Sequence, residues 1–81
     1  MREHERARKW LERNELTQRE LAERTGYTAM SINWFLKGFN PPRNGQKGAP
    51  ISEWVWQRWK RTCGDVDAEM HGRRKGEKFD W

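Results

Sequence analysis

Hydrophobic residues recur at helical spacing near the start of this chain, with charged residues between them. Over residues 3–14, Ala7, Trp10, Leu11 and Asn14 fall on one face of a helix, and the remaining positions are mostly charged. A stripe of this kind is typical of a helix that packs one side against a core. The pattern therefore predicts an amphipathic helix over residues 3–14.

A capping signal predicts that a second helix begins directly afterwards. Thr17 is followed three positions later by Glu20, the spacing of a capping box in which each side chain satisfies a free backbone N–H. Leu21 and Ala22 supply the buried face of this helix. Gly26 is expected to end it, because glycine tolerates the left-handed backbone of a sharp turn.

A third helix is predicted across the glycine turn. Thr28 is its expected N-cap, and Gly38 is its expected end. Ile32, Phe35 and Leu36 have the spacing of an inward face. The pattern thus indicates two short helices that meet across a tight turn.

The rest of the chain is predicted to be a loop, a fourth helix and a charged tail. Residues 39–50 hold all three prolines and two glycines, so no regular element is expected there. Ser52 is the expected N-cap of a helix over about 51–63, and Gly64 its expected end. Residues 65–71 are expected to add no more than a weak helical turn. Residues 72–81 are mostly charged and are predicted to be a flexible tail.

The fourth predicted helix carries more apolar surface than one core requires. At about 100° per residue, its apolar positions cover an arc of roughly 200°, about twice what one intramolecular contact buries. The excess predicts a homodimer interface, formed by Trp54, Trp56 and Trp59. The same surface is also compatible with a module that binds another protein.

Length and charge narrow the class of protein. With 81 residues there is room for one small domain, expected over residues 1–71, with the tail after it. The formal net charge is +5, and residues 39–63 carry five basic groups against one acidic group. A basic excess of this kind favours a polyanionic partner such as nucleic acid.

Several classes of function find no support in the residues. The single cysteine, Cys63, forms no internal disulfide, and no apolar run suits a membrane span or a signal peptide, so a cytoplasmic location is expected. His4 and His71 lack partners at metal-ligand spacing, and no phosphate loop or serine nucleophile motif occurs. We therefore expect no enzyme activity, no metal, no cofactor and no small-molecule substrate.

The stretch from Leu16 to Gly38 resembles the helix-turn-helix of Cro/C1-type (XRE-like) bacterial and phage regulators. The agreement covers the opening Leu-Thr-Gln, the Glu-Leu-Ala, the turn glycine, the inward isoleucine and the closing glycine. The resemblance implies an all-α, compact four- to five-helix lambda-repressor-like DNA-binding domain. In such a domain one helix crosses the phosphate backbone, and the next lies in the major groove.

The resemblance also implies which residues meet DNA. Those expected to read bases are Gln18, Thr28, Ala29, Met30, Ser31 and Asn33. Those expected to contact the DNA backbone are Arg19, Trp34, Lys37, Asn40, Arg43, Asn44 and Lys47. Many relatives carry glutamine or arginine where this chain has Ala29 and Met30, so contacts to thymine methyl groups are the expected substitute.

These observations predict a regulator of transcription that binds double-stranded DNA. The expected form is a dimeric repressor or autoregulator of phage or bacterial origin, bound to an inverted-repeat operator. Two alternatives remain open at this point. One is a protein-interaction or antitoxin-like module that uses the tryptophan-rich fourth helix, and the other is single-strand or RNA binding through stacked tryptophans.

Overall fold

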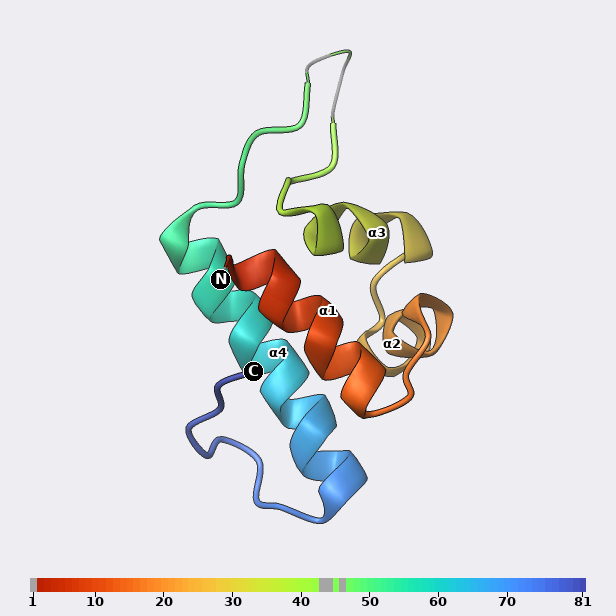
Figure 1. Ribbon diagram of the computed structural model, residues 1–81, viewed down its shortest axis with the longest axis vertical. Helices are drawn as coiled ribbons and strands as arrows, with labels where there is room; N and C mark the ends of the chain where they lie inside the picture. Colours follow the sequence, from red (N-terminus) through yellow and green to blue (C-terminus); the bar gives the residue numbers. More distant parts are fainter. Residues whose placement is uncertain (1, 43–44, 46) are drawn as a thin grey trace.

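The structure, a computed structural model, describes residues 2–42, 45 and 47–81 (Figure 1). Within them the chain forms four α-helices and no strands: α1 (Glu3–Arg13), α2 (Gln18–Thr25), α3 (Ala29–Lys37) and α4 (Glu53–His71). The radius of gyration is 12.5 Å, close to the roughly 12 Å expected for a compact chain of this length. The prediction of a compact all-α domain is confirmed.

The predicted capping residues set the ends of α2 and α3. The side-chain oxygens of Thr17 and Thr28 each accept a hydrogen bond from the backbone N–H three residues ahead, at 3.0 and 3.1 Å. Gly26 and Gly38 end the two helices in the left-handed conformation, with φ of 81° and 89°. Ser52 precedes α4 as predicted, but its side chain makes no capping hydrogen bond.

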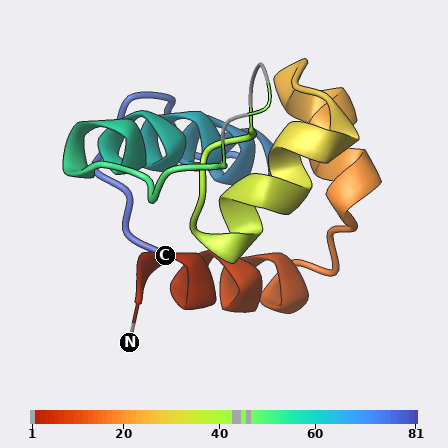
Figure 2. The same cartoon turned by 90° about the horizontal axis from the view of Figure 1, so that it is seen from above.

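The core lies where the apolar faces of the helices meet. Its largest fully buried side chains are Trp10, Phe35, Leu21, Ile32 and Cys63. Helix α3 packs against both α1 and α2, and α2 also packs against α4. Figure 2 shows α1 along one side of the domain, with α3 and α4 across from it.

Helix α4 is longer than its sequence pattern predicts. It passes through Gly64 and ends at Gly72, whose φ is 67°, so the predicted end near Cys63 is wrong. Val66 continues the buried face beyond this point and is 4% exposed. The bare side of Gly64 meets Phe79 instead of forming a turn. A glycine that makes room for a neighbour carries the same local signal as a glycine that ends a helix.

The C-terminal segment, residues 72–81, folds back onto the domain and is not a free tail. Trp81 is only 8% exposed, and its ring centroid lies 6.0 Å from that of Trp10. Its indole N–H donates to the Glu3 carboxylate at 2.8 Å, and Arg13 donates to its backbone carbonyl. The predicted flexible tail is therefore wrong, and the core extends beyond residue 71.

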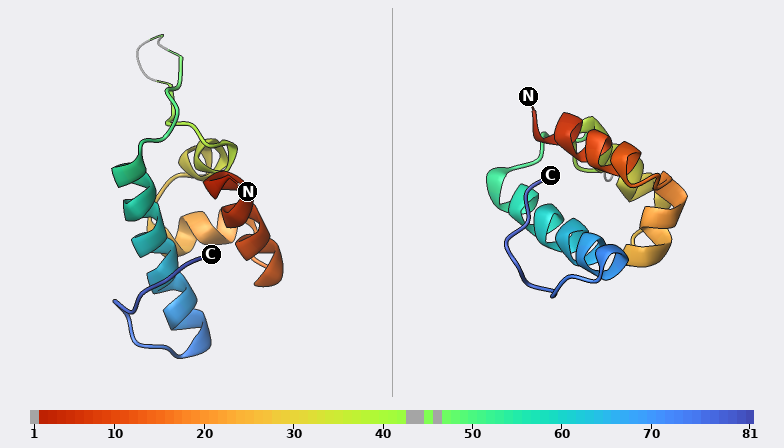
Figure 3. Two further views of the ribbon diagram at one scale, coloured as in Figure 1. Left: turned by 60° about the vertical axis from the view of Figure 1, so that its left-hand side comes forward. Right: turned by 60° about the horizontal axis from the view of Figure 1, so that its bottom comes forward.

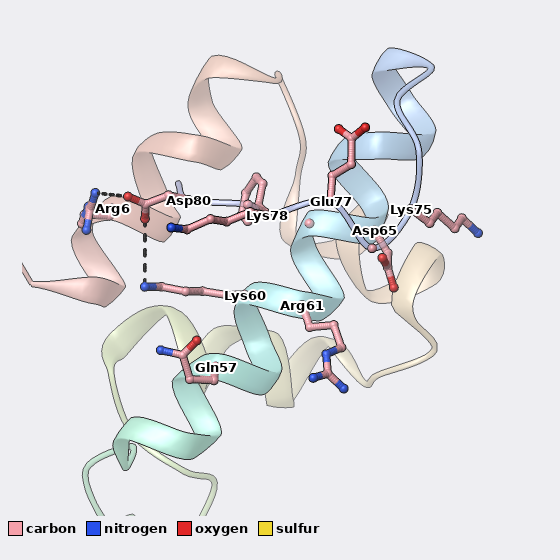
Figure 4. Close-up of a pocket in the computed structure, with 12 residues that line it drawn as sticks. Arg6, Gln57, Lys60, Arg61, Asp65, Lys75, Glu77, Lys78 and Asp80 are labelled. Carbon is pink, nitrogen blue, oxygen red and sulfur yellow. Dashed lines mark hydrogen bonds and ion pairs between the residues drawn. The ribbon is translucent and has the colours of Figure 1, made fainter.

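Ion pairs hold the C-terminal segment beside α1 and α4. Asp80 pairs with Arg6 at 3.0 Å and with Lys60 at 4.0 Å (Figure 4). Lys60 also pairs with Glu3 at 3.2 Å. Both views in Figure 3 show the segment turning back along α4. The segment looks like a solvated tail because it is highly charged, but its Asp80 forms ion pairs that hold it against the domain.

Candidate nucleic-acid interface

Helix α3 has one buried face and one open face. Ile32, Phe35 and Leu36 are 0%, 1% and 3% exposed, which confirms their predicted inward orientation. Met30, on the opposite side of the helix, is 67% exposed. Three anchored side chains hold α3 against α1 and α2 while its outer surface stays accessible.

Tyr27 lies at the edge of the core, beside the buried face of α3. It precedes α3 and remains 40% exposed. One side of its ring contacts Trp59 on α4, with centroids 4.8 Å apart. Tyr27 therefore covers the edge of the core instead of entering it.

The outermost stripe of α3 combines apolar and cationic groups. Met30, Trp34 and Lys37 follow one another at spacings of four and three residues, which places them on one helix face. The Lys37 ammonium lies 5.0 Å from the centre of the Trp34 ring. This cation–π contact positions a positive charge on the open side of the helix.

Gln18 and Asn33 are brought together although they belong to different helices. Both line a depression of about 360 Å³ where α1, α2 and α3 meet. Gln18 is the first residue of α2, and Asn33 lies on the side of α3 that faces it. Two residues that the resemblance assigns to base reading thus line one depression.

Arg8 belongs to the same surface, although the sequence gives no sign of this. Its Nε–H donates to the backbone carbonyl of Leu36 at 2.8 Å, near the C-terminal end of α3. The residue is exposed and lines the depression that holds Gln18 and Asn33. Helical spacing places Arg8 on the polar side of α1, but it does not reveal which element that side meets.

Ser31 lies on the other flank of α3, away from Asn33. The Thr28 hydroxyl donates to its Oγ at 3.0 Å, so the two predicted base-reading hydroxyls bind each other. Ala29 begins the helix and is exposed. Apart from Gln18 on α2, the predicted base-reading residues therefore lie at the start of α3, on its outer surface and on both its flanks.

The residues predicted to contact the DNA backbone are less closely grouped than those predicted to read bases. Arg19 is exposed on α2 and pairs with a glutamate one turn later at 3.5 Å. Lys47 is exposed in the loop, and Asn40 is half-buried with its backbone N–H bonded across the loop at 2.8 Å. Arg43 and Asn44 lie outside the described residues.

The predicted dimer surface requires a correction, because Trp56 is only 8% exposed. Its ring lies 5.6 Å from that of Phe35. Trp59 is half-buried and stacks on Phe35 at 4.1 Å, with planes 11° apart. Trp54 alone of the three remains on the surface, at 63% exposure. The wide apolar arc of α4 arises because α3 packs on this helix and Phe79 packs against it further along.

Cys63 carries no exposed reactive group. It is fully buried, and burial raises the pKa of its thiol well above the ordinary value. In the part of the chain that the structure describes, no three side chains of the ligating types gather to hold a metal ion. None of the helices seen there is long and apolar enough to cross a membrane.

No family model matches this chain, and neither the curated proteins nor the solved structures contain a match. Its function is therefore inferred from α2 and α3 and from the side chains they expose.

Proposed function

We propose that this protein is a sequence-specific regulator that binds double-stranded DNA through a lambda-repressor-like helix-turn-helix. The observation that carries the proposal is the arrangement of α2 and α3. Gly26 joins the helices in a left-handed turn, and Ile32 and Phe35 anchor α3 in the core. The opposite side of α3 is open, and Asn33 on one flank of the helix lines the same depression as Gln18 at the start of α2.

In this proposal α3 lies in the major groove and reads the edges of bases. The amides of Gln18 and Asn33, which line one depression, each suit adenine, which offers one donor and one acceptor there. Met30 offers an exposed apolar side chain to thymine methyl groups. A good bidentate pair contributes about 1–3 kcal/mol of discrimination between bases.

Phosphate contacts come from cations that flank α3. Lys37 lies on its outer stripe, and Arg8 lies beside its C-terminal end. Arg19 adds an exposed positive charge on α2, and Lys47 adds one in the loop. Each neutralised phosphate releases counterions, so the affinity of the proposed complex falls as the salt concentration rises.

The proposed regulator acts as a dimer in the bacterial cytoplasm and represses by occlusion. Two copies bind half-sites about one helical turn apart and block RNA polymerase at an overlapping promoter. Trp54 is the one predicted interface tryptophan still exposed, and the Arg58 guanidinium lies 5.7 Å from its ring. In this proposal the dimer forms through a symmetric contact at this end of α4.

The proposal can be tested by selecting fragments from a pool of random duplexes at moderate salt with excess competitor DNA. Enrichment of one inverted repeat is the expected result. The matched control is a Gln18→Ala, Asn33→Ala variant, whose helix content is checked by circular dichroism and whose selection should yield a degenerate site. Recovery of no enriched sequence with the unaltered protein would overturn the proposal.

A further inference from the structure

A second pocket lies between α3, the start of the loop and α4, on the flank away from Gln18. It has a volume of about 200 Å³. The lining residues that matter here are Tyr27, Ser31, Phe39, Asn40, Arg58 and Trp59. We name it the aromatic pocket. It is separate from the surface assigned above to base reading, apart from Ser31.

The walls of the aromatic pocket are π-surfaces that the fold holds in place. Trp59 is fixed by stacking on Phe35 at 4.1 Å, and the Tyr27 ring lies 4.8 Å from it. Tyr27 and Phe39 are each 40% exposed, so apolar ring surface remains uncovered at the pocket. Flat apolar walls of this kind favour a planar ligand that stacks on them.

Polar groups line the same pocket. Arg58 extends from α4, and its guanidinium lies 5.7 Å from the Trp54 ring just outside the pocket. It makes no ion pair with any residue that the structure describes, so it can turn toward an anionic ligand. Ser31 and Asn40 add a hydroxyl and an amide. A few polar groups among apolar walls are typical of small-molecule sites, where they orient the ligand. The cation selects for a ligand with a negative charge.

The size of the pocket limits the ligand. Sites for drug-sized molecules measure roughly 300–1,000 Å³, and this pocket is smaller, at about 200 Å³. It has room for a single aromatic ring or a fused pair of rings, together with a short acidic substituent.

We propose that the aromatic pocket binds a small planar aromatic carboxylic acid. Its ring lies against the exposed surfaces of Tyr27 and Phe39 and the edge of Trp59, and its carboxylate binds the Arg58 guanidinium. The pocket shares Ser31 and Asn40 with the proposed DNA contacts, but the test below contains no DNA, so either proposal can fail without the other.

The test is a titration of the isotope-labelled protein with indole-3-acetate, followed by NMR. The expected result is a saturable shift of the Ser31 and Asn40 amide signals and of the Trp59 indole N–H. A dissociation constant of about 0.1–1 mM suits a ligand of this size. Uncharged indole is expected to bind about tenfold more weakly, which corresponds to one charge-assisted contact.

Two variants separate the roles of charge and stacking. Arg58→Gln is expected to weaken indole-3-acetate about tenfold and to leave indole unchanged. Arg61→Gln is the matched control, since Arg61 is an exposed arginine on the same helix that does not line this pocket. Phe39→Ala is expected to weaken both ligands, and its partly exposed side chain makes the change compatible with folding.

Three results would overturn the proposal. The first is the absence of any saturable shift up to about 5 mM ligand, several times the expected dissociation constant. The second is equally tight binding of tryptamine, which has a positive charge in place of the carboxylate. The third is a set of shifts centred on Lys60 and Lys78, which line the charged cleft of Figure 4.

Discussion

Phe79 packs against the side of α4 that Gly64 leaves bare. A Cβ built on Gly64 would lie 2.8 Å from the Cβ of Phe79 and 3.0 Å from its Cγ. Non-bonded carbon atoms prefer separations of about 3.5–4.0 Å. Gly64 therefore leaves room for the C-terminal segment to pack against the middle of α4. Glycine at such a position would ordinarily only weaken the helix.

Gly64→Ala is expected to destabilise the protein by about 1–3 kcal/mol, the usual cost of overpacking. In an unhindered helix interior the same change would stabilise by about 1 kcal/mol. The reversed sign arises because the new methyl group meets the Cβ of Phe79, which is close to the backbone and cannot easily move away. Urea unfolding measures the difference.

The Gly64→Ala, Phe79→Gly double variant, compared with Phe79→Gly alone, is the control for this prediction. With both the Cβ and the ring of Phe79 removed, the Gly64→Ala change should follow ordinary helix preference and no longer destabilise the protein. A single Gly64→Ala variant more stable than the parent protein would contradict the docked position of Phe79.

Trp81→Ala is expected to lower the free energy of unfolding by about 3 kcal/mol, within the range for large aromatic residues in cores. The indole is 8% exposed and donates a hydrogen bond to Glu3. Trp54→Ala is the matched control. Because Trp54 is 63% exposed within one chain, its loss should change the stability of the monomer, measured at concentrations too low for dimers, by no more than about 0.5 kcal/mol. Equal effects of the two substitutions would mean that Trp81 is not part of the core.

Cys63 predicts a specific dependence of stability on pH. Burial raises the pKa of its thiol in the folded protein, while in the unfolded chain a thiol ionises near pH 8.5. Below that pH both states keep the proton, and stability does not depend on this group. Above it only the unfolded state loses the proton, so the free energy of unfolding falls by up to about 1.4 kcal/mol per pH unit.

The control for the pH prediction is Cys63→Ala, compared with the parent protein by urea unfolding from pH 7 to pH 10, a range that spans the ordinary thiol pKa of about 8.5. The stability difference between the two proteins should shrink steadily at the alkaline end. A difference that stays constant over this range would show that the thiol ionises in the folded state as well.

Local signals in the sequence predict the first three helices well. Thr17, Thr28, Gly26 and Gly38 act on backbone groups only a few residues away, so their effects can be recognised in a short stretch. Gly64 acts on a residue fifteen positions later, and no local pattern distinguishes that use from a helix end. The sequence pattern therefore predicts a helix shorter than the observed α4.

For the candidate site too, the sequence predicts the features that depend on local spacing and not those that depend on packing between distant elements. The open face of α3 follows from helical spacing, as Met30 shows. The approach of Arg8 to Leu36 and the grouping of Phe39 with Arg58 depend on how distant elements pack. The spacing of Trp56 shows that it lies on an apolar face of its helix, but it does not show that Phe35 covers this face. The pattern alone therefore predicts an interface.

Asn33 and Lys37 are expected to affect DNA binding in different ways. Asn33→Ala should cost about 1–3 kcal/mol on the selected operator and relax the preference at one base pair. Lys37→Gln should weaken binding to all sequences and reduce the salt slope by about one. Fluorescence anisotropy at several salt concentrations measures both. If Lys37→Gln changes which sequence is preferred, the proposed phosphate role of Lys37 is wrong.

Trp54→Glu tests the remaining part of the proposed dimer surface. A buried glutamate at a two-fold interface faces its own copy, so the dimer should dissociate into monomers. The fold should persist because Trp54 is exposed within one chain. Sedimentation equilibrium measures the mass. An unchanged mass, with unchanged helix content, would exclude this end of α4 as the interface.

The contact between Trp81 and Glu3 has a consequence for shortened forms of the protein. The Trp81 indole packs on Trp10 and donates a hydrogen bond to Glu3, the first residue of α1. The core beside α1 is therefore covered only when residue 81 is in place. A shortened form made without Trp81 would therefore keep the residues of all four helices but leave Trp10 partly uncovered, and proteases would cleave it faster than a form that includes Trp81.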